Sequence, residues 1–347
     1  MRIGVSVMYW PWFELDEQIA LAEQADRLGF ASVWVAESWG QDAVAMLGAI
    51  AARTERIGLG AGVMQIPARQ PTSAAMAATT LDGISRGRFR LGLGLSGPQV
   101  SEGWYGVPFT APLARTREYV EIVREALSGR PVDYAGTHWS IPIRDAGMGL
   151  GKPLKLLGKP AIDRVPIYLA VTGPKTVEQA GRIADGWLPF LYSPQSAEMM
   201  NEPLLRGIEA AGRRRADLTI APMVPTAVHA DLGEARALVR PFLAFYLGAM
   251  GARDKNFYVE LADRLGHGAS ARACQDRFLA GDRAGAAAEL SDDLVDLAGL
   301  AATPATLERR LAEYQAAGVD ELIVVPFGDR PGTLSALAPH LAHSATP

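Results

Sequence analysis

Short runs of β-branched and other apolar residues alternate along the chain with longer segments whose apolar residues recur every three or four positions. The short runs are typical of buried strands, and the longer spacing is typical of helices that cover a sheet. Repeated alternation of the two predicts parallel strands joined by crossover helices. We predict eight strands at Arg2–Met8, Ser32–Ala36, Ile57–Gly62, Phe89–Gly94, Pro166–Val171, Gly186–Phe190, Thr219–His229 and Glu321–Pro326.

The first predicted helix shows the pattern most clearly. Gly29 follows it as a stop signal. Its apolar residues fall on one face, at Leu15, Ile19, Ala22, Ala25 and Leu28. Eight strand–helix units are the number in a (β/α)8 TIM barrel, so we predict an α/β fold of this kind, with residues 1–347 as a single domain.

Two stretches exceed the simple repeat and are predicted insertions on the barrel, after strands 4 and 7. The first, about 98–165, contains a helical pattern near Leu113–Leu127. It also contains a Gly- and Lys-rich loop, Arg144 to Lys159, whose composition excludes a regular element. The second, about 252–302, contains two further helical patterns.

Composition narrows the partners and the compartment. The chain has 347 residues, 49% of them hydrophobic, and a formal net charge of -4. This charge gives no attraction to nucleic acid or to anionic membranes. The longest strongly apolar run, 241–252, is too short to span a bilayer, which takes about 20 residues. A lone Cys274 excludes an internal disulfide, and the first strand lacks the features of a signal peptide, so we expect a cytoplasmic protein.

Gly92, Gly94 and Gly97 have the G-x-G-x-x-G spacing of a dinucleotide-binding turn. That motif belongs at the first strand-to-helix turn, where a helix opens inside the glycines. Here three units precede it, and Pro98 disfavours helical geometry at Gly97, so we predict no helix before about Pro112. The pattern therefore argues against a nicotinamide site. The glycines could still let the backbone approach another ligand closely.

In a barrel, functional groups gather where each strand ends and its following loop begins. These positions are rich in aromatic residues and glycine and carry few ionised groups, which suits a flat, conjugated ligand. For any single tryptophan, a role in plugging the barrel mouth is an equally good interpretation. The strand-end residues are Tyr9–Trp12, Glu37–Trp39, Gly62–Gln65, Ser96–Gln99, Thr172–Lys175, Trp187–Phe190 and Pro326–Phe327.

With these blocks in place, the chain resembles the luciferase-like monooxygenase superfamily, and within it the branch that uses the deazaflavin coenzyme F420. The run TLDGISRGRFRLGLGLSGPQV (80–100) is most similar to that branch. The resemblance covers nearly the whole chain, in the blocks 34–43, 56–106, 112–127, 151–156, 166–189 and 316–327.

The resemblance implies a luciferase-like TIM barrel, paired as a homodimer, that holds the cofactor ring at the C-terminal mouth. It also implies a non-proline cis peptide at Gly62–Val63, behind the ring. By the same resemblance, Lys152, Lys155 and Lys159 could meet the acidic tail of the cofactor, although a solvated loop is the commoner role. The cofactor contacts that it implies are Gly62, Val63, Met64, Gln65, Gly94, Leu95, Ser96, Gly97, Pro98, Gln99, Val171, Thr172, Gly173, Pro174 and Lys175.

Reduced deazaflavin passes a hydride and reacts poorly with oxygen, so the implied reaction is a two-electron reduction of a small molecule, or its reverse. Glu37 is the best acid candidate, because a carboxyl near Trp34, Trp39 and Trp10 could have its pKa raised by desolvation. The alternative is a carboxylate that only contacts the cofactor or nearby amides. Glu102 and Asp42 are weaker acid candidates.

The sugar-phosphate dehydrogenases of this family place a histidine directly after that acid, and here the residue is Ser38. A sugar phosphate is therefore a disfavoured substrate. We assign catalytic roles to Glu37, Ser38 and Trp39, and substrate contacts to Tyr9, Trp10 and Trp104. No cluster of ligand residues with suitable spacing predicts a metal.

Two other functions stay open. An FMN-dependent monooxygenase uses the same barrel, with oxygen and a flavin reductase as partners. A barrel that binds the cofactor without turnover is a minor alternative. Binding of the deazaflavin against FMN distinguishes the first of these from F420-dependent hydride transfer.

Overall fold

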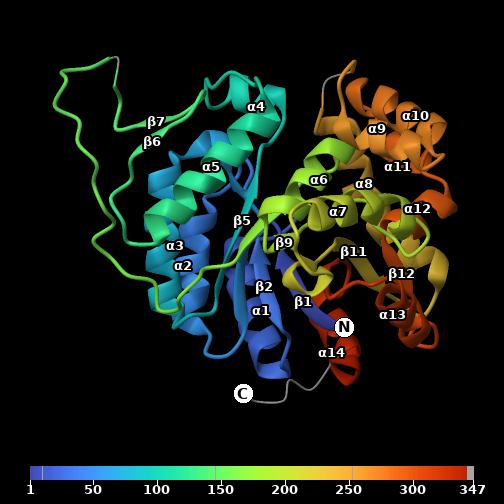
Figure 1. Ribbon diagram of the computed structural model, residues 1–347. Coiled ribbons are helices and arrows are strands. Elements are labelled where there is room, and N and C mark those ends of the chain that lie inside the picture. The colour runs from blue at the N-terminus through green and yellow to red at the C-terminus, as the bar shows by residue number, and fades with distance from the viewer. Residues whose placement is uncertain (10, 145, 252, 342–347) are drawn as a thin grey trace.

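In a computed structural model that describes residues 1–9, 11–144, 146–251 and 253–341, parallel strands stand at the centre and helices cover them (Figure 1). Each strand of this central sheet pairs in parallel with its neighbours, as the alternation of strands and helices predicts. The central strands are β1 (Arg2–Val7), β2 (Ser32–Val35), β3 (Gly58–Ala61), β5 (Phe89–Gly94), β8 (Ile167–Ala170), β9 (Gly186–Trp187), β10 (Thr219–Ile220), β11 (Met223–Val228) and β13 (Glu321–Pro326).

The strands close into a barrel through the segment 219–228. β10 pairs with β9, and β11 pairs with β13, which in turn pairs with β1. Between them the amide of Ala221 donates to Trp187 O at 2.9 Å, and Pro222 O accepts from the amide of Ile323 at 2.9 Å. The predicted strand Thr219–His229 is therefore two short strands. Ala221 bonds to β9 on one side and Pro222 bonds to β13 on the other, so the hydrogen-bond ladder is interrupted between them. The predicted (β/α)8 barrel is confirmed.

Helices form the outer layer, and the first of them ends at Gly29 with φ 90°, as its stop signal predicts. The barrel helices are α1 (Leu15–Leu28), α2 (Ala43–Arg53), α3 (Pro71–Ser85), α5 (Pro112–Leu127), α6 (Pro174–Ile183), α7 (Ala197–Ala210), α8 (Leu232–Ala249), α13 (Leu307–Ala316) and α14 (Arg330–Leu337). None of the helices in these described parts of the chain is long and apolar enough to cross a bilayer.

Further elements lie in the two long connections, and β4 and the 3-10 turns lie elsewhere between the barrel elements. The segment Arg144 to Lys159 forms no helix or strand in its described residues, as its composition predicts. The strand β12 was not predicted, because three residues are too few to show a period. The elements are β4 (Met64–Gln65), α4 (Pro98–Gly103), β6 (Tyr134–Ala135), β7 (Ser140–Ile141), α9 (Phe257–Arg264), α10 (Gly268–Leu279), α11 (Arg283–Ala288), α12 (Asp292–Ala298) and β12 (Leu300–Ala302), with 3-10 turns η1 (Ile66–Ala68), η2 (Arg215–Asp217) and η3 (Ala338–His340).

The helix α4 corrects the prediction that no helix begins before Pro112. Pro98 does keep the preceding Gly97 extended, at φ -114° and ψ 168°. Gly97 is nevertheless the N-cap residue, a position that requires an extended backbone. Pro98 then occupies the first helical turn, where a missing N–H costs nothing. A proline that disfavours helical geometry in the residue before it can therefore itself be the first residue of a helix.

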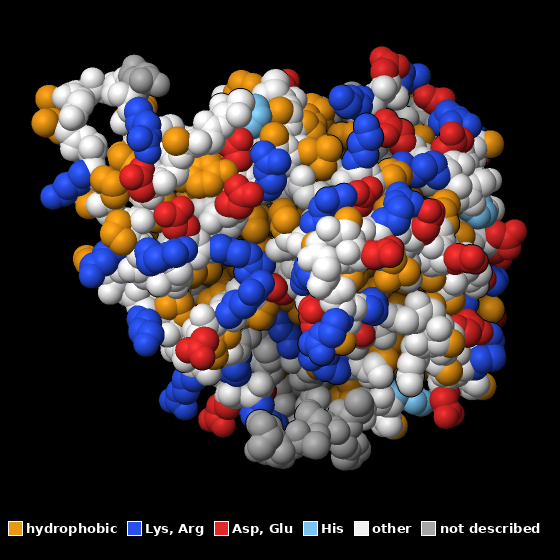
Figure 2. Space-filling view, viewed as in Figure 1, with side chains coloured by type: hydrophobic (Ala, Val, Ile, Leu, Met, Phe, Trp, Pro, Cys, Tyr) orange, Lys and Arg blue, Asp and Glu red, His pale blue; other side chains and the backbone are white. Residues whose placement is uncertain are grey.

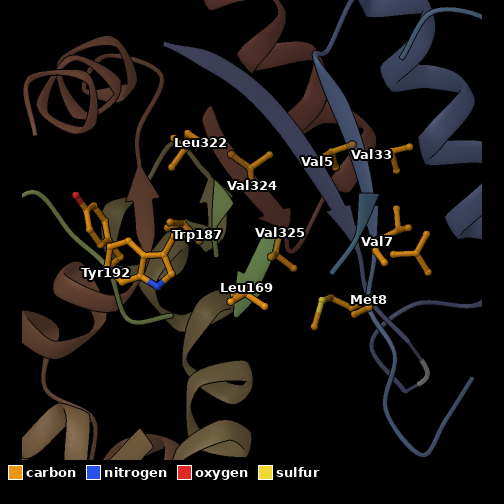
Figure 3. Close-up of a cluster of buried hydrophobic side chains, with 14 of the residues drawn as sticks. Val5, Val7, Met8, Val33, Leu169, Trp187, Tyr192, Leu322, Val324 and Val325 are labelled. Carbon is orange, nitrogen blue, oxygen red and sulfur yellow. The ribbon is translucent and has the colours of Figure 1, made fainter. Parts of the chain in front are cut away.

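Apolar side chains fill both the space between strands and helices and the interior of the barrel. Figure 3 shows part of the larger cluster, with Val5 and Val7 from β1 beside Val33 from β2, and Trp187 beside Tyr192. A smaller cluster contains Trp34 and Tyr168, whose rings meet edge to face at 5.1 Å. Packing of this density fixes where each strand ends.

A buried charge network lies at the N-terminal ends of the strands. Glu321 is fully buried and contacts Arg90 Nη1 at 3.0 Å and Arg2 Nη2 at 3.1 Å. Burial opposes its charge, but the two guanidinium groups and hydrogen bonds from Ser32 and Trp34 lower its pKa overall. The network therefore holds an ionised carboxylate at the end of the barrel opposite to the strand-end residues of interest.

The glycines of the G-x-G-x-x-G run have packing roles. A Cβ on Gly92 would lie 1.9 Å from the backbone oxygen of Ala61, on the neighbouring strand β3. A Cβ on Gly94 would lie 2.7 Å from Cγ2 of Val63. At Gly97 the nearest atom is Gln99 Oε1 at 3.9 Å, so that position has space. Two of the three glycines are thus required by the barrel itself.

We expect Gly92→Ala to lower the free energy of unfolding by about 3 kcal/mol, because the new methyl group meets backbone that cannot move aside. Gly97→Ala, in the same run, is the matched control and should change stability by less than about 1 kcal/mol. Chemical denaturation of both variants measures the difference. Equal stability of the two variants would contradict this packing role.

Candidate active site

A cavity of about 810 Å3 opens at the C-terminal ends of the strands. Its wall includes residues that follow β1, β2, β3, β5, β8 and β9, together with residues from α4, α8 and α9. In Figure 1, α4 and α9 stand on opposite sides of this end of the barrel. A cavity of this size accommodates a cofactor or a drug-sized ligand.

Backbone hydrogen bonds bring the strand ends together. The amide of Ala36 donates to Val7 O at 3.4 Å, and the amide of Gly62 donates to Val35 O at 2.8 Å. The ends of β1, β2 and β3 are therefore neighbours, and so are the segments that begin at Tyr9, Glu37 and Val63. Residues distant in the sequence meet here because parallel strands end at the same edge.

The peptide bond Gly62–Val63 is cis, as the resemblance predicts. The Val63 side chain lies against Gly94 on β5, and a Cβ at Gly62 would lie 2.2 Å from Cε of Met223. Directly after it, β4 pairs with β5 through Met64 and Leu93. This segment therefore forms one packed side of the cavity.

Most of the predicted site residues line the cavity. Trp10 lies outside the described residues. Ser38, Met64, Pro98, Pro174 and Lys175 do not form part of the cavity wall. The predicted residues that do line it are Tyr9, Glu37, Trp39, Gly62, Val63, Gln65, Gly94, Leu95, Ser96, Gly97, Gln99, Trp104, Val171, Thr172 and Gly173.

Glu37 is held by an ion pair that the sequence did not reveal. Its two carboxylate oxygens accept hydrogen bonds from Arg69 Nη1 and Nη2, each at 2.6 Å. The amide of Gln65 donates to Glu37 Oε2 at 2.9 Å, and the amide of Ala43 donates to Oε1 at 3.3 Å. The predicted surroundings of tryptophans are wrong for Trp34, whose indole nitrogen donates to Ser32 and Glu321 at the other end of the barrel.

Arg69 connects Glu37 to a second carboxylate. Its side chain is 13% exposed and also pairs with Asp42, which caps α2 by accepting from the amide of Ala45 at 2.8 Å. Burial opposes the charge of Arg69, but Glu37 and Asp42 raise its pKa overall. Asp42 is thus structural in its contacts, and Glu102 likewise accepts from the amide of Phe109.

The N-terminus of α6 reaches the cavity at Gly173 and Thr176. The first turn of this helix carries no acidic residue, so its dipole and amides favour an anion there. Arg264 from α9 also lines the cavity and donates from Nη2 to Thr172 O at 3.0 Å. Lys175 is exposed beside this turn. The arrangement suits a phosphate group.

An aromatic wall joins Phe190, one of the predicted strand-end residues, to Tyr246 and Tyr258, which were not predicted. Phe190 stacks on Tyr246 with centroids 4.6 Å apart, and Tyr258 meets both rings edge to face at 4.9 and 5.3 Å. All three line the cavity, with Phe257 and Met250 beside them. In the sequence, the residues of α8 and α9 have the apolar pattern of ordinary packed helices, which gave no sign of this role.

The tryptophans of the strand ends divide into two groups. Trp12 packs edge to face against Phe242, Phe245 and Phe327, and Trp187 is fully buried. These two rings are therefore packing residues, and the Trp187 indole nitrogen donates to Val171 O at 2.9 Å. Trp39 and Trp104 line the cavity and stay 44% and 63% exposed.

Three buried polar atoms near the cavity make no well-aligned hydrogen bond to any described residue. They are Tyr9 Oη, Ser38 Oγ and Gln65 Oε1, from residues only 5%, 5% and 6% exposed. Buried polar groups are nearly always satisfied in folded proteins. Such atoms at a cavity indicate a place where a ligand or water completes the hydrogen bonding.

Comparison with known proteins supports this picture. The chain is 41% identical over 328 residues, 93% of its length and 94% of the relative's, to a Mycobacterium tuberculosis protein provisionally named a coenzyme F420-dependent oxidoreductase. It is 28% identical over 325 residues to the 5,10-methylenetetrahydromethanopterin reductase of Archaeoglobus fulgidus, covering 93% of this chain and 92% of that one.

Among solved structures, the coenzyme F420-dependent tetrahydromethanopterin reductase of Methanopyrus kandleri has the same fold, with a TM-score of 0.81 at 23% identity over 98% of this chain and 99% of that one. The model of the luciferase-like monooxygenase family matches residues 1–321. This match covers every residue of the cavity wall and all the barrel strands up to Glu321, the first residue of β13. The chain belongs to the luciferase-like monooxygenase family.

Proposed function

We propose that this protein is a coenzyme F420-dependent oxidoreductase that transfers a hydride between the deazaflavin ring and a small organic substrate. One observation carries the proposal. A relative named for F420 dependence matches 93% of the chain, and the chain has a cavity whose walls fit a planar ring joined to a phosphate. Bound F420 supplies the hydride chemistry.

The cavity provides for each part of such a cofactor. Val63, next to the cis peptide, supports the proposed position of the ring, and Gly94 keeps the neighbouring strand close behind it. Leu95, Ser96, Gly97 and Gln99 border the proposed path from the ring to the phosphate. The first turn of α6 and Arg264 suit the phosphate itself.

We assign Glu37 a positioning role. Arg69 donates to both of its carboxylate oxygens, and the amides of Ala43 and Gln65 donate to one oxygen each, with Gln65 two residues after the cis peptide. A carboxylate held in this way fixes the segment 63–65 relative to β2 and α2. This favours the contact interpretation of Glu37 over the proton-donor interpretation.

The exposed lysines Lys152, Lys155 and Lys159 have no part in the cavity wall. The basic residues that do line the cavity are Lys255, just before α9, and Arg264, at the end of α9. Lys255 lines the cavity and is exposed, so it suits the acidic tail of the cofactor better than the loop lysines do.

We also propose that the protein acts in the cytoplasm as a homodimer. On the face shown in Figure 2, positive and negative side chains are interspersed, with no large patch of one sign. The projecting residues 143–144 and 146–157, by contrast, expose five large apolar side chains, and surfaces of this kind mark interaction sites. They are Ile143, Met148, Leu150, Leu154 and Leu157.

The first test is cofactor choice. We expect the purified apoprotein to bind F420 at least about tenfold more tightly than FMN, because the family branch that it most resembles uses the deazaflavin. Fluorescence titration with each cofactor measures the two dissociation constants. Tighter binding of FMN would favour the monooxygenase alternative, and binding of neither would contradict both.

The second test concerns Glu37. We expect Glu37→Gln to weaken F420 binding by about tenfold or more, because Arg69 loses a buried anionic partner and the segment 63–65 loses its anchor. Asp42→Asn is the matched control, since Asp42 contacts the same guanidinium from a half-exposed position. It should have an effect of about threefold or less. A proton donor alone would leave F420 affinity unchanged in Glu37→Gln, with loss confined to turnover.

The third test concerns the dimer. Light scattering after size-exclusion chromatography should give twice the chain mass of 37.0 kDa. Replacing Leu150 and Leu157 together by serine should shift the molecule toward the monomer, because apolar surface drives association. A monomeric wild-type protein would refute the dimer, and an unshifted dimer would place the interface elsewhere.

A further inference from the structure

The Tyr9 hydroxyl is a buried polar group at the cavity wall whose hydrogen bonding is incomplete. Tyr9 is 5% exposed, lines the cavity, and directly follows β1 and Met8. Its oxygen makes no well-aligned hydrogen bond within the described parts of the chain. Leaving such a group unsatisfied costs free energy, so the site is built to receive a partner.

Two hydroxyl groups lie close to it. Ser38, after β2, and Tyr246, on α8, are near enough to affect the pKa of Tyr9. Burial dominates, however, and raises the pKa of Tyr9 above its ordinary value of 10.0. The phenol is therefore protonated at neutral pH and can donate a hydrogen bond. Ser38 and Tyr246 restrict the direction in which it can do so.

The described part of the cavity wall beside Tyr9 is aromatic. Phe190, Tyr246 and Tyr258 form the adjoining wall. Of the charged residues on the cavity wall, the buried Glu37 is paired with Arg69, while Lys255, Glu260 and Arg264 are exposed to solvent. A charged ligand would lose its hydration here without compensation, whereas an uncharged apolar one would not.

We propose that the Tyr9 hydroxyl donates a hydrogen bond to the carbonyl oxygen of an uncharged, apolar ketone or enone, with Ser38 and Tyr246 as positioning neighbours. This inference rests on the proposed function and names its substrate class. A hydrogen bond to the oxygen draws electrons from the carbonyl carbon, or from the far carbon of an enone. It thereby stabilises the negative charge that develops on oxygen when a hydride arrives.

The test uses two probes of nearly the same shape, acetophenone and α-methylstyrene, which differ in having C=O or C=CH2. Both are measured by calorimetry on the protein loaded with oxidised F420, so that no turnover occurs. We expect acetophenone to bind the wild type about tenfold more tightly than α-methylstyrene, because only the ketone can accept the hydrogen bond. The aromatic wall should bind both.

Tyr9→Phe should abolish this preference and leave the affinity for α-methylstyrene within about twofold of the wild type. Tyr192→Phe is the matched control, because it also removes a buried tyrosine hydroxyl, but one that bonds Asn201 away from the cavity. It should keep the full preference. Ser38→Ala should reduce the preference about threefold, since the phenol loses one restraint but keeps its proton.

The outcomes separate this inference from the proposed function. If the wild type binds no F420, the proposed function fails. If it binds F420 but shows no preference for acetophenone, or binds neither probe, this inference fails alone. The inference also fails if Tyr9→Phe keeps the preference. Should Tyr9→Phe not fold, Ser38→Ala and Tyr246→Phe decide, because an unchanged preference in both would overturn the assignment.

Discussion

The ion pair between Glu37 and Arg69 is the interaction on which the geometry of the cavity depends. It joins the end of β2 to the turn after β4, and the same carboxylate accepts from backbone amides of Gln65 and Ala43. A buried pair is stable only when its remaining hydrogen-bonding capacity is satisfied. Here the donors are Arg69 and the amides of Gln65 and Ala43, and Gln65 lines the cavity, so the pair fixes this part of the wall relative to β2 and α2.

Close packing between β3 and β5 supplies the second constraint. Gly92 admits the backbone of Ala61, and Gly94 admits the side chain of Val63 beside the cis peptide. The same glycine spacing in a dinucleotide-binding fold would serve the pyrophosphate. The motif therefore has no fixed meaning by itself. Its role depends on where it lies: β5 is the fourth strand of the barrel, and Gly97 is the N-cap residue of α4.

The sequence predicted the cavity residues that follow the strands better than those that lie on helices. The residues after β1, β2, β3, β5 and β8 could be named because barrel strands present their C-terminal ends to the site. Arg69, Tyr246, Tyr258 and Arg264 could not be named. Arg69 lies 32 residues after its partner, and the other three lie on or just before helices whose apolar spacing is the same as that of any packed helix.

The sequence by itself determined the order and type of the elements, because strand and helix periods are local and each can be counted within a few residues. Through the resemblance it also indicated the cofactor class and the cis bond. Only the tertiary structure decided which polar groups meet. It paired Glu37 with Arg69 and buried the Tyr9 hydroxyl beside the cavity without a well-aligned partner among the described residues, because such contacts depend on how strands and helices from distant parts of the chain pack in space.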